Sequence, residues 1–65
     1  MLNLYDVVIL KQGVKSPALP PGSRGTVLIV FESNPPAYEV EFVKADGSSL
    51  GTFTIAEADL EKSDI

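Results

Sequence analysis

The side chains that most often carry out chemistry in proteins are largely missing from this 65-residue chain. It has no cysteine, histidine or tryptophan, which excludes thiol redox chemistry, imidazole general-base catalysis and the commonest zinc ligands. Glu39 and Glu41 remain, and their spacing places them on one face of an expected strand, about 7 Å apart. Paired carboxylates act as acid and base when a pocket shifts their pKa values. On an exposed hairpin we expect a solvated face instead, with no catalytic residue, no metal and no cofactor.

The Gly22-Ser23-Arg24-Gly25 segment is a second place where chemistry could occur, because glycine-rich turns can bind phosphate through backbone N–H groups. A P-loop requires a lysine and a helix after its glycines, whereas an apolar, strand-like segment follows here. We therefore expect both glycines to serve the backbone geometry of a turn. The C-terminal acidic residues do not follow the spacing of a calcium-binding EF-hand.

The elements that would position these residues are short strands. Apolar residues recur with a period of two and are interrupted by turn-forming residues, a pattern typical of an all-β domain. The expected strands are residues 4–10, 24–32, 38–43 and 49–55. A long loop at 11–23 with several Pro and Gly residues, a turn at 33–36 and a tight Asp46-Gly47 hairpin connect them.

The C-terminal segment predicts one helical turn. Thr54 and Glu57 have the spacing of a capping box, and we expect a turn over 56–59, followed by Leu60 on a short fifth strand. These elements describe a single domain, residues 1–65. The predicted fold class is a small all-β SH3-like barrel of four to five antiparallel strands with one short C-terminal helical turn. An open antiparallel sheet or a five-stranded OB-type barrel is the alternative.

Several segments occur together in an order that resembles a known family. They are Leu4-Tyr5-Asp6-Val7-Val8, Pro21-Gly22-Ser23-Arg24-Gly25-Thr26-Val27, Tyr38-Glu39-Val40-Glu41-Phe42-Val43 and Asp46-Gly47. On these residues the chain resembles domain-of-unknown-function family 4926, whose members are small bacterial proteins common in cyanobacteria. The resemblance implies a small SH3-like barrel with no established activity, no catalytic residues to carry over, and an accessory or antitoxin-like role.

Two shorter motifs resemble SH3-like domains with other binding functions. Leu4-Tyr5-Asp6 is similar to the Ala-Leu-Tyr-Asp-Tyr motif of SH3 domains that bind proline-rich peptides. Such a groove needs aromatic walls, and the chain has no Trp, so we expect a structural role for Tyr5. Gly25-Thr26-Val27 is similar to the glycine turn of KOW-type domains, which makes a KOW-like nucleic-acid-binding domain the alternative function.

The charge balance bears on the class of partner. The formal net charge is −4, with five basic and nine acidic residues, and an acidic chain repels phosphate backbones. Nucleic acid is therefore disfavoured, and binding it would rely on Lys11, Lys15 and Arg24. The longest apolar runs fall far short of the ~20 residues of a membrane helix, and the N-terminus lacks a signal-peptide pattern. We expect a cytoplasmic protein with no membrane partner.

The most informative segment is Val27-Leu28-Ile29-Val30-Phe31, which is apolar on both faces of its expected strand. If Val27, Ile29 and Phe31 point into the barrel, Leu28 and Val30 point outward. Either the 11–23 loop covers them with Val14 and Leu19, or they form a surface for a partner protein or for self-association into a homo-oligomer. So short a chain offers little room for a deep pocket, which favours a non-enzymatic protein-interaction module. The predicted partner-binding residues are Leu19, Pro20, Leu28 and Val30.

Overall fold

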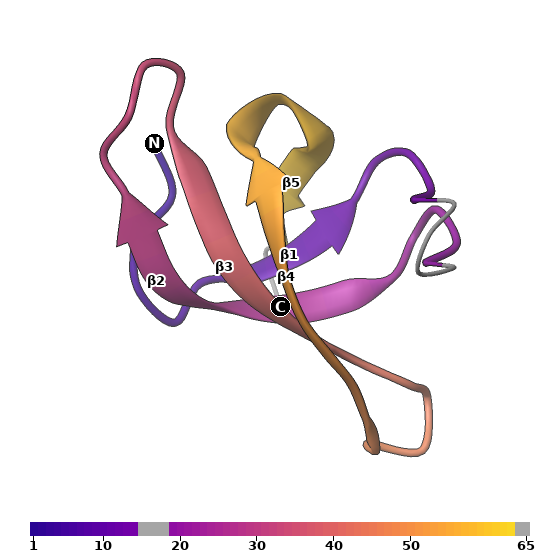
Figure 1. Ribbon diagram of the computed structural model, residues 1–65. Coiled ribbons are helices and arrows are strands. Elements are labelled where there is room, and N and C mark those ends of the chain that lie inside the picture. The colour runs from indigo at the N-terminus through magenta and orange to yellow at the C-terminus, as the bar shows by residue number, and fades with distance from the viewer. Residues whose placement is uncertain (15–18, 64–65) are drawn as a thin grey trace.

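The computed structural model describes residues 1–14 and 19–63. Its elements follow one another as β1 (Val7–Leu10), β2 (Arg24–Phe31), β3 (Ala37–Val43), β4 (Ser49–Ala56), the 3₁₀ turn η1 (Glu57–Asp59) and β5 (Leu60–Lys62). All five strands form one antiparallel sheet in the order β4-β3-β2-β1-β5 (Figure 1). The predicted all-β class, with five antiparallel strands and one C-terminal helical turn, is confirmed.

The sheet is twisted and open. β4 and β5 are its two edges, and no ladder joins them within the described residues, so hydrogen bonds do not close a barrel there. The chain instead passes through η1 from β4, at one edge, to β5, which pairs with β1 at the other edge. The two ends of the sheet therefore contribute side chains to one core.

The core lies on the inner face of this sheet. Its buried residues are Val8, Leu10, Leu19, Val27, Tyr38, Val40, Phe42, Ile55 and Leu60. β3 alternates as its sequence predicts, because Tyr38, Val40 and Phe42 are buried while Glu39 and Glu41 are only half-buried. Burial of this apolar set is the main force that stabilises a chain without disulfides.

The hairpin between β3 and β4 forms at the predicted Asp46-Gly47 turn. Gly47 has a φ of +89°, which glycine adopts without steric cost. The Asp46 carboxylate accepts hydrogen bonds from the N–H and the hydroxyl of Ser48, at 2.9 and 2.7 Å. Both bonds favour the charged form and lower the pKa of Asp46 below its usual value. The turn chemistry therefore fixes the register of the hairpin, as expected.

β2 departs from the predicted pattern after Val27. Its register with β3 shifts between Val27 and Ile29, so Leu28 is the extra residue of a β-bulge. The bulge reverses the alternation: Ile29 and Phe31 are exposed, while Val30 packs against the core. The expectation that Ile29 and Phe31 point inward and Val30 outward is therefore wrong beyond Val27, because one added residue exchanges the two faces of a strand.

The predicted capping box does not form at η1. The residue before this turn is Ala56, and no side chain caps it. The Thr54 hydroxyl donates instead to Glu39 at 2.7 Å, and the Glu57 carboxylate accepts a hydrogen bond from the Tyr38 hydroxyl. The helical turn is present where the sequence predicts it. The side chains of Thr54 and Glu57 form hydrogen bonds with residues of β3 and do not cap the turn.

The long loop between β1 and β2 folds back on itself. Val14 and Leu19 exchange two backbone hydrogen bonds of 2.8 Å, and Leu19 is only 2% exposed. Whether the whole 11–23 loop is ordered is a question that falls partly on residues 15–18, which lie outside the described residues.

Candidate protein-binding surface

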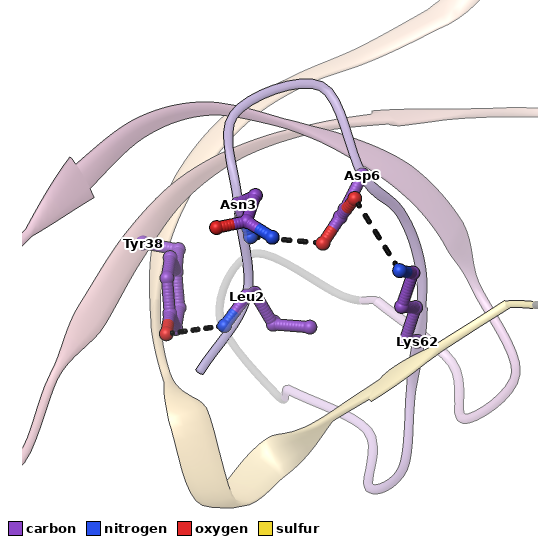
Figure 2. A network of polar contacts seen from close by, with 5 residues as sticks. All are labelled: Leu2, Asn3, Asp6, Tyr38 and Lys62. Atoms are coloured by element: carbon purple, nitrogen blue, oxygen red, sulfur yellow. Dashed lines mark hydrogen bonds and ion pairs between the residues drawn. The ribbon is translucent and has the colours of Figure 1, made fainter.

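The N-terminal segment makes a tight turn before β1. The Asp6 N–H donates to the Asn3 carbonyl at 3.1 Å. The Asn3 N–H donates to the Asp6 carboxylate at 2.8 Å, as Figure 2 shows. Tyr5, the third residue of this turn, has a φ of 67°, a left-handed conformation for which turns normally use Gly or Asn. This turn is the reason that β1 begins at Val7 and not at residue 4.

The backbone and the side chain of Tyr5 have different surroundings. Its N–H donates to the Val27 carbonyl at 2.7 Å, which extends the pairing of β1 and β2 toward the N-terminus. Its side chain is 72% exposed. The structural role expected of Tyr5 thus belongs to its backbone, and the ring is presented to solvent from a strained position.

Other large apolar side chains are exposed beside this turn. On β2, Ile29 is 48% and Phe31 is 41% exposed. The exposed large hydrophobic residues of the described chain are Met1, Leu4, Tyr5, Ile29 and Phe31. We call these five residues the apolar surface. They come from two segments, the N-terminal turn and the second half of β2, and three of them, Met1, Leu4 and Ile29, line one groove. Contiguous exposed apolar groups are a common mark of interaction sites.

A shallow groove of about 600 Å³ runs between these two segments. Its lining residues are Met1, Leu2, Asn3, Leu4, Leu28, Ile29, Val30 and Glu32. The groove is mostly apolar and carries one carboxylate, that of Glu32. The groove is open, whereas small-molecule sites are usually deeper and more enclosed.

Tyr38 holds the N-terminal wall of the groove in place. Its hydroxyl accepts a hydrogen bond from the Leu2 N–H at 3.0 Å and donates one to the Glu57 carboxylate (Figure 2 shows the first). Burial, and then the hydrogen bond to Glu57, raise the pKa of Tyr38 above its usual value. The buried ring on β3 therefore ties the N-terminal segment to η1.

The outer face beside the apolar surface is acidic. Ile29 pairs directly with Glu39 across β2 and β3. Among the described residues, Glu39 and Glu41 accept side-chain hydrogen bonds from the hydroxyls of Thr54 and Ser49 on β4. Within the described residues the one ion pair joins Lys62 to Asp6, at 3.9 Å (Figure 2). Neither glutamate forms an ion pair with a described lysine or arginine.

The comparison with known families gives a match over nearly all of the chain. The sequence model of a family described as a domain of unknown function (DUF4926) matches residues 4–62. The chain belongs to the DUF4926 family. The resemblance seen in the sequence is thereby confirmed at the level of the family. No curated protein and no solved structure matches the chain.

The structure separates the four residues predicted to bind a partner in this DUF4926 chain. Leu19 is buried in the core, Val30 packs against the core, and Leu28 is half-buried in the bulge, where it lines the groove. Pro20 is exposed and lines the groove beside the β3–β4 hairpin, not the groove beside the second half of β2. The prediction that Leu19 lies on a binding surface is wrong, because Leu19 is buried in the core cluster.

A second groove, of about 770 Å³, lies between the 11–23 loop and the β3–β4 hairpin. Its lining residues are Pro20, Pro21, Gly22, Ser23, Arg24, Val43, Lys44, Ala45, Gly47 and Leu50. Arg24 is the only one of the three predicted nucleic-acid contacts that lines it. Lys11 is exposed outside this groove, and Lys15 lies outside the described residues.

Sequence reasoning missed the apolar surface for two physical reasons. Ile29 and Phe31 were assigned to the inner face because a bulge leaves no trace in a uniformly apolar run. The sequence predicts only a structural role for Tyr5, and its exposed ring is missed because the left-handed φ falls on a residue that is neither glycine nor asparagine. A signal was present in Asn3 and Asp6, since both residue types favour turns.

Neither a metal site nor a membrane span is found in the part of the chain that the structure describes. No three acidic side chains there are close enough to hold a metal ion together, and no helix has the length and apolar character to cross a bilayer.

Proposed function

We propose that this DUF4926 chain is a non-enzymatic protein-interaction module that binds a partner protein through the apolar surface. The observation that carries the proposal is the exposure of Met1, Leu4 and Ile29 around one groove, with Tyr5 and Phe31 exposed on the same two segments. Exposed aromatic and aliphatic side chains are the usual anchors of protein interfaces. An accessory or antitoxin-like role is the cellular form that such a module would take.

The acidic residues around the apolar surface indicate the charge that the partner protein would carry. Glu32 lines the groove, and Glu39 lies beside Ile29 on the outer face. The chain as a whole carries −4. A partner that presents apolar side chains flanked by Lys or Arg would complement this arrangement, since electrostatic complementarity speeds association and sets specificity.

The substitution Ile29→Lys tests the proposal. It removes an exposed apolar anchor and adds a cation that repels a basic partner, while Glu39 across the strand pair accommodates the new charge in the fold. Affinity capture from cells of the native host should recover a basic partner with the unchanged chain and lose it with the Ile29→Lys chain, by at least about tenfold in the amount bound.

Thr26→Lys is the matched control. Thr26 lies on the same strand and pairs with Glu41, so the charge change is identical but falls outside the groove. Capture by the control should equal that of the unchanged chain, and circular dichroism should show both variants folded. If a folded Ile29→Lys chain retains the same partner in full, the apolar surface is not the binding site.

A KOW-like nucleic-acid-binding role is the competing proposal. It would use the groove that Arg24 and Lys44 line. Titration with a single-stranded or double-stranded oligonucleotide at low salt separates the two functions, because a nucleic-acid module gives binding that weakens steeply as salt is added.

A further inference from the structure

β4 is an edge strand, and its second half lacks the usual protection against pairing. It runs beside β3 and has no strand on its other side within the described chain (Figure 1). Its residues, Ser49–Ala56, include no proline and no charged side chain. Natural sheets normally protect such an edge with charges, prolines, bulges or short length. β5, the opposite edge, is only three residues long and carries Glu61 and Lys62.

A bulge protects one half of β4 and leaves the other half straight. The register with β3 shifts at the start of the strand, and Gly51 there has a φ of +114°. From Thr52 to Ala56 the pairing with β3 is regular. The segment Thr-Phe-Thr-Ile-Ala is therefore an extended edge of five residues, rich in the types that favour strands.

The hydrogen-bond pattern shows which backbone groups are free. The Glu57 N–H donates to the Pro36 carbonyl at 3.1 Å, just beyond the last pair of β3 and β4. Antiparallel ladders alternate between bonded and non-bonded pairs, so Phe53 and Ile55 direct their backbone groups toward β3. The N–H and C=O of Thr54 then point away from the sheet, and among the described residues nothing binds them.

We propose that β4 pairs with β4 of a second copy of this chain, antiparallel and about a twofold axis at Thr54. In this register Thr54 faces its own copy, and Thr52 faces Ala56 of the second chain. The outward-directed groups of each residue then meet their partners, because an antiparallel edge pairing about a twofold is complementary to itself. The pairing also covers Phe53, whose ring is only partly buried.

Charge favours a second copy at this edge and disfavours one at the apolar surface. Two acidic chains brought together on their outer faces would place Glu39 near Glu39 of the second chain. Across paired β4 strands the same carboxylates lie three strand spacings apart, about 14 Å, which exceeds the Debye length of about 8 Å at physiological ionic strength. The nine residues from Ser48 to Ala56 are free of charge, so repulsion is least here.

The variant Thr54→Lys tests the pairing. It places two lysines directly opposite each other in the dimer, while in each monomer the lysine lies beside Glu39 on β3. Light scattering of the unchanged chain, from micromolar to millimolar, should show a mass that rises from monomer to dimer. The variant should raise the dimer Kd by at least about tenfold, and the control Thr26→Lys should leave it unchanged.

Amide hydrogen exchange locates the contact independently of any substitution. In the unchanged chain the Thr54 amide should exchange quickly when dilute and slowly when concentrated, whereas the Phe53 and Ile55 amides should be protected at both concentrations. A chain that stays monomeric throughout overturns the proposal, and so does a dimer with a fast Thr54 amide. Either result leaves the proposed partner surface on β2 untouched, because that surface is tested by Ile29→Lys in a different assay.

Discussion

At the scale of single residues, Tyr5 has a backbone conformation that its residue type disfavours. Its backbone occupies the left-handed region, which costs a residue other than glycine about 1–2 kcal/mol. Its exposed ring gains little packing in return. Strain of this kind gathers at ligand-binding positions, so under the proposed function we expect the exposed ring to contact the partner protein.

The substitution Tyr5→Gly follows from this imbalance. Glycine adopts the left-handed conformation without steric cost, and part of that gain is offset by its greater freedom in the unfolded chain. We expect the free energy of unfolding to rise by about 0.5–1 kcal/mol in urea denaturation, while partner capture falls. Leu4→Gly is the control, because Leu4 has no left-handed φ to relieve and should lose stability. A Tyr5→Gly chain that is less stable than the parent would contradict the strain argument.

At the scale of elements, the alternation of apolar residues predicts a regular strand but does not predict a bulge of one residue. The alternation of Tyr38, Val40 and Phe42 predicted β3 correctly, and the Asp46-Gly47 turn predicted its hairpin. Ile29 was misplaced because the bulge at Leu28 arises from the fit of two strands, which neither strand shows alone.

The partner-binding residues were harder to predict than the fold for the same reason. Leu19 and Pro20 are adjacent in the sequence, yet one is buried and the other exposed. Burial in a loop depends on where the loop folds back, here through the pairing of Val14 with Leu19. No pattern of apolar residues between 11 and 23 specifies that contact.

The close approach of β2 and β3 gives a prediction at this scale. A Cβ added to Gly25 would lie 2.6 Å from Cγ1 of Val40 and 2.7 Å from the Glu41 carbonyl oxygen, so Gly25→Ala forces the two strands apart. We expect a loss of about 2–3 kcal/mol in the free energy of unfolding. A Cβ added to Gly47 would meet no atom within 4 Å. Gly47→Ala should therefore lower the free energy of unfolding only by the cost of a left-handed φ at alanine, about 1–2 kcal/mol. Equal losses in the two variants, measured by urea denaturation, would show that the strands adjust freely.

At the scale of the whole molecule, the hydroxyl of Tyr38 joins parts of the chain that are distant in sequence. It accepts a hydrogen bond from the Leu2 N–H near the N-terminus and donates one to the Glu57 carboxylate in η1, just before the last strand. A sheet whose edges are not bonded to each other relies on such contacts to hold its ends together. Loss of a partly buried hydrogen bond of this kind costs about 1–3 kcal/mol, a large share of the stability of so small a domain.

The raised pKa of Tyr38 makes this contact sensitive to alkali. The unfolded chain releases the phenolic proton near the usual value of 10.0, whereas the folded chain, through burial and the hydrogen bond to Glu57, holds it to higher pH. Folded protein therefore binds more protons than unfolded protein above pH 10.0, and stability falls as pH rises. Below pH 10.0 the protonated Tyr38 hydroxyl makes its full contribution to the free energy of unfolding.

Urea denaturation of the parent and of Tyr38→Phe across alkaline pH tests this account of the whole molecule. The Tyr38→Phe chain should be less stable than the parent by about 1–3 kcal/mol at neutral pH, and the difference should shrink above pH 10.0 as the parent loses its proton-linked stability. The Tyr5→Phe chain keeps Tyr38 as its one tyrosine, so its ultraviolet tyrosinate absorbance reports the ionisation of Tyr38 directly. A difference between parent and Tyr38→Phe that stays constant into strong alkali would mean that the Tyr38 proton is not linked to unfolding.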